Sequence, residues 1–107
     1  MYAQMIKGIL EGCILDIISH EEIYGYELNT KLNKYGFTFV SEGSIYPLLL
    51  RMQKERLIEG NLKVSNLGPK RKYYRITKQG LEQLEVFKKN WDIVSTAVNH
   101  LLRKRKK

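Results

Sequence analysis

The sequence predicts a mainly α-helical fold with a small two-stranded β-wing and a long final helix. Three observations support this fold class. Apolar residues recur at helical spacing in three short segments before residue 57. Alternating residues around a Gly-Pro turn indicate a β-hairpin over residues 57–77. Residues 78–102 then carry apolar side chains at regular steps of three and four, as a long amphipathic helix does.

Length and charge limit the kinds of protein this can be. The chain has 107 residues, of which 43% are hydrophobic and 28% charged, a composition typical of a single globular domain. Residues 1–66 hold seven Lys/Arg and eight Asp/Glu, whereas residues 67–107 hold twelve and three. This asymmetry predicts a polyanionic partner, either nucleic acid or an anionic membrane surface. Residues 103–107 form a basic tail that we expect to be disordered.

Targeting signals are not evident. The longest apolar run is short and broken by charge, so no transmembrane helix is expected. The N-terminus lacks the pattern of a secretory signal. Cys13 is the single cysteine, which excludes an internal disulfide and fits a reducing, cytoplasmic location. It lies on the apolar face of the first helix and is interpreted as a small core residue.

The first two helices follow from apolar spacing. Residues 4–19 carry a stripe of Ile, Leu and Cys at helical steps. A short second helix is predicted around Leu28 and Leu32, ended by Gly36 in a left-handed cap. His20 and His100 lack Cys or carboxylate partners at ligand spacing, so neither a metal nor a cofactor is expected.

The third helix should begin after Ser41, which is a good N-cap residue. Pro47 follows closely, and a proline inside a helix costs about 3 kcal/mol. We therefore expect the helix to start late or to have an irregular first turn. The same end carries Gly43, Ser44 and Tyr46, whose small or hydroxyl-bearing side chains suit close approach by a partner.

The hairpin carries the most unusual stretch, G-P-K-R-K-Y-Y-R at residues 68–75, where four cations surround two adjacent tyrosines. Asn66, Gly68 and Pro69 are turn residues. A strand has a period of two, so one tyrosine can anchor the hairpin to the core while the other stays near the cations. One face of the strand then carries Arg71, Tyr73 and Arg75, and the other carries Lys72, Tyr74 and Ile76.

The last helix is predicted to begin after Thr77 as its cap and to run to about Leu102. Its apolar positions step by 3, 4, 3, 4 and 3, which is typical of a coiled-coil seam. These positions are Leu84, Phe87, Trp91, Val94, Val98 and Leu101.

The order of these elements predicts a winged helix-turn-helix over residues 1–77 and a helical arm over residues 78–102. In such a fold the third helix presents its N-terminal residues to base edges in the DNA major groove. The basic hairpin is then the wing, whose cations neutralise the neighbouring phosphates.

Several short motifs together resemble the short subgroup of PadR-like bacterial transcriptional regulators. They are Y-G-Y-E-L at residues 24–28, S-E-G-S-I-Y-P-L-L at 41–49, L-I at 57–58, the wing stretch G-P-K-R-K-Y-Y-R-I-T-K-Q-G, and Trp91. The resemblance covers nearly the whole chain. It implies a homodimeric repressor that binds an inverted-repeat operator and dimerises through its C-terminal helix. Arg56 departs from the pattern, since the family usually has Gly there.

The resemblance also implies site residues. It places DNA contacts on the start of the third helix and on the wing. It also implies that two second-helix tyrosines, Tyr24 and Tyr26, either lie near the DNA backbone or pack the motif. Together with the residues singled out above, the candidate DNA-binding set is Tyr24, Tyr26, Ser41, Gly43, Ser44, Tyr46, Pro47, Arg51, Lys70, Arg71, Lys72 and Tyr73. The candidate dimer interface is the seam of the last helix. Trp91 within it either packs or, with Asp92, holds a small aromatic effector; we favour packing.

Other functions are weighed against DNA binding. An enzyme would need a nucleophile with its base, a carboxylate pair or a metal cluster, and the sequence offers no such pattern. A membrane-surface protein would use the basic tail behind an amphipathic helix. A winged helix that only docks proteins would not need basic residues on its wing, and the stacking pattern of RNA-binding folds is missing. Binding to double-stranded DNA is therefore the leading hypothesis.

Overall fold

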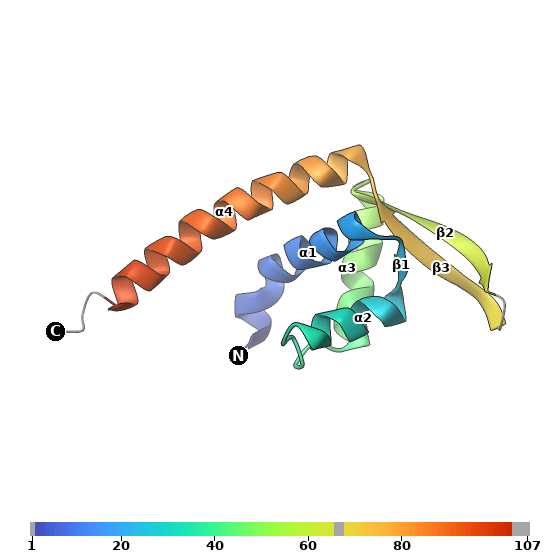
Figure 1. Cartoon of the computed structure of the whole chain (residues 1–107), viewed down its shortest axis with the longest axis horizontal. Coiled ribbons are helices and arrows are strands. Elements are labelled where there is room, and N and C mark those ends of the chain that lie inside the picture. Colours follow the sequence, from blue (N-terminus) through green and yellow to red (C-terminus); the bar gives the residue numbers. More distant parts are fainter. Residues whose placement is uncertain (1, 66–67, 104–107) are drawn as a thin grey trace.

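The computed structural model describes residues 2–65 and 68–103 and confirms the predicted fold class (Figure 1). The predicted turn residue Asn66 and tail residues 104–107 lie outside the described residues. Within the described ranges, no helix is long and apolar enough to cross a membrane. In chain order the elements are α1 (Tyr2–His20), β1 (Ile23–Tyr24), α2 (Gly25–Lys34), α3 (Glu42–Lys54), β2 (Ile58–Ser65), β3 (Gly68–Ile76) and α4 (Lys78–Arg103).

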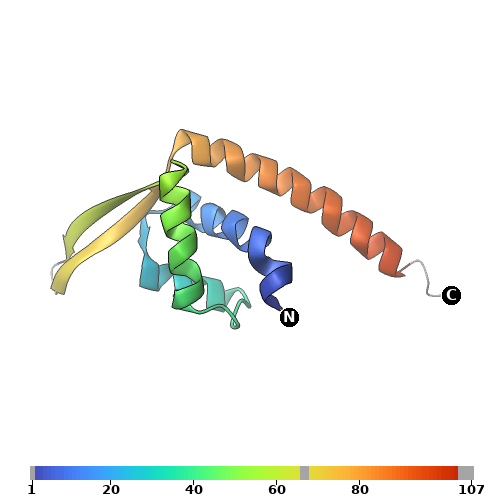
Figure 2. The same ribbon diagram turned by 180° about the vertical axis from the view of Figure 1, so that it is seen from behind.

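The core lies where α1, α2 and α3 meet the root of the hairpin. In Figure 1, α3 lies behind α1 and α2, and Figure 2 shows it in front of them. Each helix turns its apolar stripe inward, because that removes the most apolar surface from water. The fully buried side chains include Ile14 of α1, Leu28 and Leu32 of α2, and Leu49 and Met52 of α3.

The sheet has three strands in the order β1-β3-β2, one more than predicted. The additional strand is β1, in which Ile23 pairs with Tyr74 and Tyr24 with Tyr73. A strand of two residues is too short to show a period in the sequence, so only its pairing reveals it. As expected, one tyrosine anchors the hairpin: Tyr74 is 3% exposed, whereas Tyr73 is half-buried.

The start of α3 is regular, contrary to the expectation raised by Pro47. The Ser41 hydroxyl accepts a hydrogen bond from the Ser44 N–H (3.3 Å), and the helix begins directly at Glu42. Pro47 lies inside it. Its missing N–H removes only the bond to the carbonyl of Gly43. Because Gly43 is exposed in the first turn, water can satisfy that carbonyl and the helix continues.

The backbone at the end of α3 shows why glycine suits the position that Arg56 occupies in this chain. The Leu57 N–H donates to the Met52 carbonyl (2.9 Å) and the Arg56 N–H to the Gln53 carbonyl (2.9 Å). This pair of bonds is the Schellman motif, which needs a left-handed residue just after the helix. Arg56 has a φ of 63° and is the one described non-glycine residue with positive φ. A glycine at this position would adopt the same conformation without strain.

Helix α4 begins at a tight junction with the end of α3. Thr77 caps it as predicted, because its hydroxyl accepts from the Gly80 N–H (2.9 Å). The Thr77 N–H donates to the Leu57 carbonyl (3.1 Å), and its hydroxyl lies 2.7 Å from the Arg56 carbonyl. A Cβ on Gly80 would lie 2.1 Å from the Leu57 carbonyl oxygen, so only glycine allows this approach.

The predicted seam of α4 divides into two parts. Leu84 is only 2% exposed in the core of its own chain, and Phe87 packs against that core. The Phe87 ring faces Gly12 of α1 so closely that a Cβ there would lie 2.3 Å away. Leu84 and Phe87 therefore fix the arm to the body and offer little surface to a second chain. Further along, α4 extends beyond the body (Figure 1), and Trp91, Val94, Val98 and Leu101 are about half exposed.

The left-handed conformation of Arg56 leads to a stability prediction. Arg56→Gly should raise the free energy of unfolding by about 0.5–1 kcal/mol, because it relieves the strain of a left-handed L-residue. The greater conformational freedom of glycine in the unfolded chain offsets part of this gain. Urea unfolding at one fixed protein concentration measures the change. Arg56→Ala is the control, since it removes the same side chain and keeps the strain. Equal stability of the two variants would contradict this explanation.

Candidate nucleic-acid interface

A cleft of about 760 Å³ lies between the start of α2, the first two turns of α3 and the root of the wing. Its volume is in the range of ligand-binding clefts, but it is shallow and open to solvent. Exposed aromatic and cationic side chains form its rim, and buried apolar residues form its floor. The lining residues are Tyr24, Gly25, Tyr26, Glu42, Gly43, Ile45, Tyr46, Leu49, Arg71, Lys72 and Tyr74.

The cations of the wing rest on aromatic rings. The guanidinium of Arg71 lies 4.5 Å from the ring centre of Tyr24, which meets the Tyr73 ring edge-on at 5.3 Å. The Lys63 ammonium lies 5.3 Å from the ring centre of Tyr73. We call these four residues the cation–aromatic ladder. Each cation–ring contact contributes about 0.5–1 kcal/mol at an exposed site and does not cancel the charge of the cation.

Ion pairs separate the wing cations into two groups. Arg75 donates to the Glu59 carboxylate through two nitrogens, at 3.0 and 3.1 Å, and Lys63 pairs with Glu22. By contrast, none of the ion pairs in the described part of the chain includes Lys70, Arg71 or Lys72. These three consecutive cations are exposed. They form the unpaired basic segment of the wing, which attracts an anion without first breaking an ion pair.

The first turns of α3 present polar groups beside this basic segment. Ile45 and Leu49 point into the core and hold the helix against the body. Tyr46 lies between them in sequence but is 58% exposed at the rim of the cleft. The hydroxyls of Ser41 and Ser44 lie 3.2 Å apart and are exposed next to it. The rigid face of a helix thus holds the groups that could meet a partner.

The structure brings together half of the candidate DNA-binding set. Six of its members line the cleft, namely Tyr24, Tyr26, Gly43, Tyr46, Arg71 and Lys72. Four others adjoin it in sequence or in the strand pairing: Ser41, Ser44, Pro47 and Tyr73. Lys70 lies further out along β3, toward the tip of the wing.

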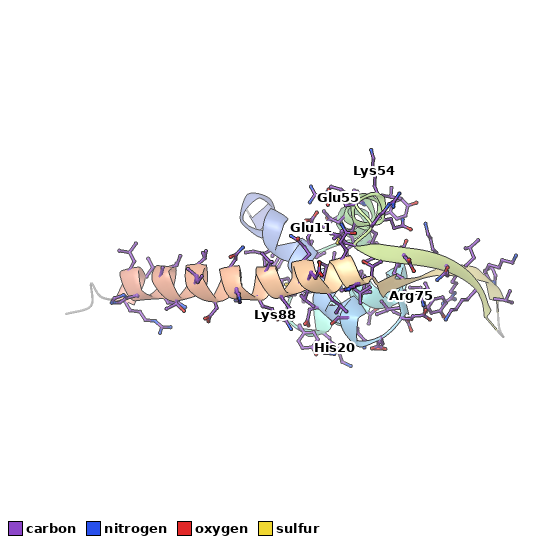
Figure 3. The ribbon with its side chains drawn as sticks, turned by 90° about the horizontal axis from the view of Figure 1, so that it is seen from above. Glu11, His20, Lys54, Glu55, Arg75 and Lys88 are labelled. Carbon is purple, nitrogen blue, oxygen red and sulfur yellow. The ribbon has the colours of Figure 1, made fainter. Side chains whose placement is uncertain are left out.

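Arg51 does not join this group. Its guanidinium pairs with Glu11 of α1 and lies 4.0 Å from the carboxylate of Glu55, the C-cap residue of α3. Figure 3 shows Glu11 and Glu55, the two carboxylates near Arg51, on the same side of α4. Arg51 lies almost two turns beyond Ser44 in α3, and its ion pair with Glu11 joins this part of the helix to α1.

Two charged residues of this surface were missed in the sequence. Glu42 lines the cleft and is the first residue of α3. Its place inside the motif S-E-G-S was the signal that could have identified it. Lys63 belongs to the cation–aromatic ladder, and it pairs in register with Arg71 across the hairpin. The sequence shows such a pair only after the register of the turn is known.

A second hollow of about 550 Å³ lies between α1, α2 and α4 and includes Cys13 and Phe87. Burial raises the pKa of the Cys13 thiol, and the neighbouring Asp16 carboxylate raises it further. Both effects disfavour the thiolate, which is the reactive form of cysteine. The interpretation of Cys13 as a packing residue therefore agrees with its surroundings.

The fold and the cleft together define a winged helix-turn-helix protein with a helical arm. The model of the Transcriptional regulator PadR-like family matches residues 14–86, and the chain belongs to this family. A crystal structure of a PadR-like transcriptional regulator from Bacillus cereus strain ATCC 14579 is 78% identical, with a TM-score of 0.86. The match covers 94% of this chain and 97% of that one.

More distant structures share the same fold. A Streptococcus transcriptional regulator is 43% identical, with a TM-score of 0.85 and coverage of 94% of this chain and 98% of that chain. Bacillus subtilis PadR, whose structure was determined in complex with operator DNA, is 23% identical with a TM-score of 0.66. That match covers 74% of this chain and 46% of the longer protein, and it supports the fold.

The buried tyrosine of the cleft leads to a prediction at high pH. Burial raises the pKa of the Tyr74 hydroxyl above its ordinary value of 10.0, and the nearby Tyr46 adds to the rise. The folded protein thus holds this proton to a higher pH than the unfolded chain. The contribution of Tyr74 to stability is complete below about pH 10 and is lost as the pH rises through its native pKa.

The measurement is an alkaline absorbance titration of tyrosinate in the wild type and in Tyr74→Phe. We expect one tyrosine of the wild type to ionise later than the rest, and this late step to be missing from the variant. Tyr26→Phe is the control, because the Tyr26 ring is 62% exposed. A late step that survives in Tyr74→Phe would show that another tyrosine is the protected one.

Proposed function

We propose that this chain is a sequence-specific DNA-binding transcriptional regulator that acts as a homodimeric repressor on an inverted-repeat operator. The observation that carries the proposal is the cleft. It brings the first turns of α3 next to Arg71 and Lys72, two cations that have no ion-pair partner in the described part of the chain. A helix that enters the major groove and a basic wing on the flanking phosphates need this juxtaposition.

Each part of the surface has a distinct task in this proposal. The exposed residues Glu42, Ser44 and Tyr46 face base edges, because N-terminal residues of a recognition helix reach the groove. The unpaired basic segment 70–72 neutralises phosphates and sets the register of the protein on the duplex. The operator complex of Bacillus subtilis PadR supports this geometry by its shared fold.

The exposed end of α4 supports the homodimer. A helix that leaves Trp91, Val94, Val98 and Leu101 half exposed gains stability when a second copy covers that stripe. Leu102, which is also exposed, extends the same face. A two-fold dimer meets two half-sites about one helical turn apart, roughly 34–36 Å, which requires an inverted repeat. The proposed repression follows from the resemblance to the PadR-like family.

The wing cations provide the first test of DNA binding. Lys70→Ala and Arg71→Ala should weaken binding to every duplex sequence alike, because phosphate contacts carry no base information. For each variant, the slope of log affinity against log salt should fall by about 0.9. Fluorescence anisotropy with operator and unrelated duplexes at several salt concentrations measures both effects.

Arg75→Ala is the matched control, since Arg75 lies on the same strand but is already paired with Glu59. It should change the salt slope by much less than Arg71→Ala. Identical slopes for the wild type and both wing variants would rule out the phosphate-binding role.

Anionic vesicles test the rival membrane-surface function in the same assay. Binding to vesicles but not to duplex DNA at physiological salt would favour that rival.

Trp91 provides the test of the dimer. Its side chain is 47% exposed, and burial of an aromatic ring removes about 150–250 Å² from water. Trp91→Ala should therefore weaken the dimer by about 2–4 kcal/mol, in the range of large-to-small substitutions at buried sites. Sedimentation equilibrium measures the dissociation constant. Ile93→Ala is the control, because Ile93 is exposed on the opposite face of α4.

The same variant separates the two roles considered for Trp91. If the residue packs, Trp91→Ala loses dimer stability. If instead Trp91 and Asp92 hold a flat aromatic effector, the dimer stays intact and the variant no longer binds a planar aromatic cation. Titration of the wild-type tryptophan fluorescence with such a cation is the direct measurement. We propose the packing role, because the stripe around Trp91 is apolar at every position of the 3-4 pattern.

A further inference from the structure

Glu42 is an acidic residue in a surface that otherwise suits an anion. It is the first residue of α3 and the one acidic side chain among those lining the cleft. Arg71 and Lys72 line the same cleft. Glu42 is exposed, and no ion pair within residues 2–65 and 68–103 includes it. An unpaired carboxylate at this place repels phosphate, so it weakens binding to DNA in general.

Helix stability alone does not account for this position. A carboxylate in the first turn interacts favourably with the helix dipole. However, the first turn is already capped by the Ser41 hydroxyl, which accepts from the Ser44 N–H. The Ser44 hydroxyl lies 3.2 Å from that of Ser41, so these two hydroxyls bind each other. Of the polar side chains at this end of α3, Glu42 and Tyr46 are the ones without an internal partner in the described residues.

The chemistry of the major groove restricts what Glu42 can bind. An ionised carboxylate only accepts hydrogen bonds. Guanine offers the acceptors N7 and O6 there, and thymine offers the acceptor O4 and a methyl group. Cytosine presents an N4 amino donor with no acceptor beside it, whereas adenine presents its donor next to the N7 acceptor. A carboxylate is therefore best satisfied by cytosine. Opposite adenine it meets the N7 acceptor beside the amino donor, and opposite guanine or thymine it is left desolvated and unpaired.

We propose that Glu42 is a specificity-determining residue that accepts a hydrogen bond from the N4 amino group of one cytosine in each half-site. This inference rests on the proposed function, since it requires α3 to enter the major groove. The carboxylate repels phosphate and so reduces affinity for unrelated sequences. At the preferred site, the hydrogen bond from cytosine offsets this repulsion. Specificity is a difference of two affinities, and a repulsive group that one site satisfies enlarges this difference.

The experiment is selection of duplexes from a random pool by the wild-type chain and by Glu42→Gln, followed by sequencing. The wild type should enrich an inverted repeat with one invariant cytosine per half-site. Glu42→Gln should lose that cytosine and prefer adenine there, because an amide matches the adenine donor–acceptor pair. We expect the ratio of affinities for cytosine and adenine at this base to change by about five-fold or more.

Two further variants act as controls. Glu55→Gln removes the same charge by the same chemistry from the far end of α3, where the side chain lies 4.0 Å from Arg51. It should enrich the wild-type motif unchanged. Glu42→Ala has neither donor nor acceptor, so it should lose the cytosine preference without gaining one for adenine. It should also bind an unrelated duplex more tightly than the wild type, because the repulsive charge is gone.

The outcomes separate this inference from the proposed function. If the wild type enriches no motif, specific DNA binding itself is wrong. If the wild type enriches a motif and both Glu42 variants enrich the same one, DNA binding stands and the role of Glu42 is wrong. A loss of selectivity that Glu55→Gln shares would also overturn the inference, because it would reflect total charge instead of base contact.

Discussion

The hydrogen bonds of Thr77 join the end of α3 to the start of α4, and the position of the arm relative to α3 depends on this joint. Its N–H donates to the Leu57 carbonyl, and its hydroxyl accepts from Gly80 while it lies 2.7 Å from the Arg56 carbonyl. Helices α3 and α4 are thus fixed to each other through the backbone of residues 56–57 and 77–80. Since the arm is the proposed contact between two copies, this joint sets the distance and angle between the two recognition helices. The strained conformation of Arg56 is tolerated because the surrounding bonds determine it.

In the wing, an aromatic ring holds the cation of Arg71 in place without neutralising its charge. A carboxylate partner positions a cation but cancels its charge, as Glu59 does for Arg75. The ring of Tyr24 positions Arg71 with no opposing charge, and the electrostatic attraction for phosphate is kept. The two tyrosines within residues 68–75 have separate tasks. Tyr74 is buried and fixes the strand, whereas Tyr73 forms the middle of the cation–aromatic ladder.

Much of this fold could be predicted from the sequence, because its helices follow apolar periodicity and its caps are local. Ser41, Thr77 and Gly36 act where local chemistry places them: two accept hydrogen bonds at helix N-termini, and Gly36 has a φ of 111°. Features that depend on tertiary contact were missed. The strand β1 exists only because β3 lies beside it, and Lys63 joins the ladder only through the hairpin register. The ion pair of Arg51 with Glu11, forty residues away in the chain, also depends on tertiary contact. A DNA contact by Arg51 stays a prediction.

The division of the α4 seam connects folding to binding. Leu84 and Phe87 are covered within one chain, so the first turns of the arm are stable in a monomer. The outer turns expose Trp91 and the apolar residues after it, and in the proposed dimer a second copy covers them. One copy of α3 with its wing would make few phosphate contacts, whereas the proposed dimer presents two sets at once. The second set then binds intramolecularly, at a high effective concentration. In the proposed dimer, affinity for an inverted repeat therefore depends on chain concentration, and the same apolar stripe controls both assembly and DNA binding.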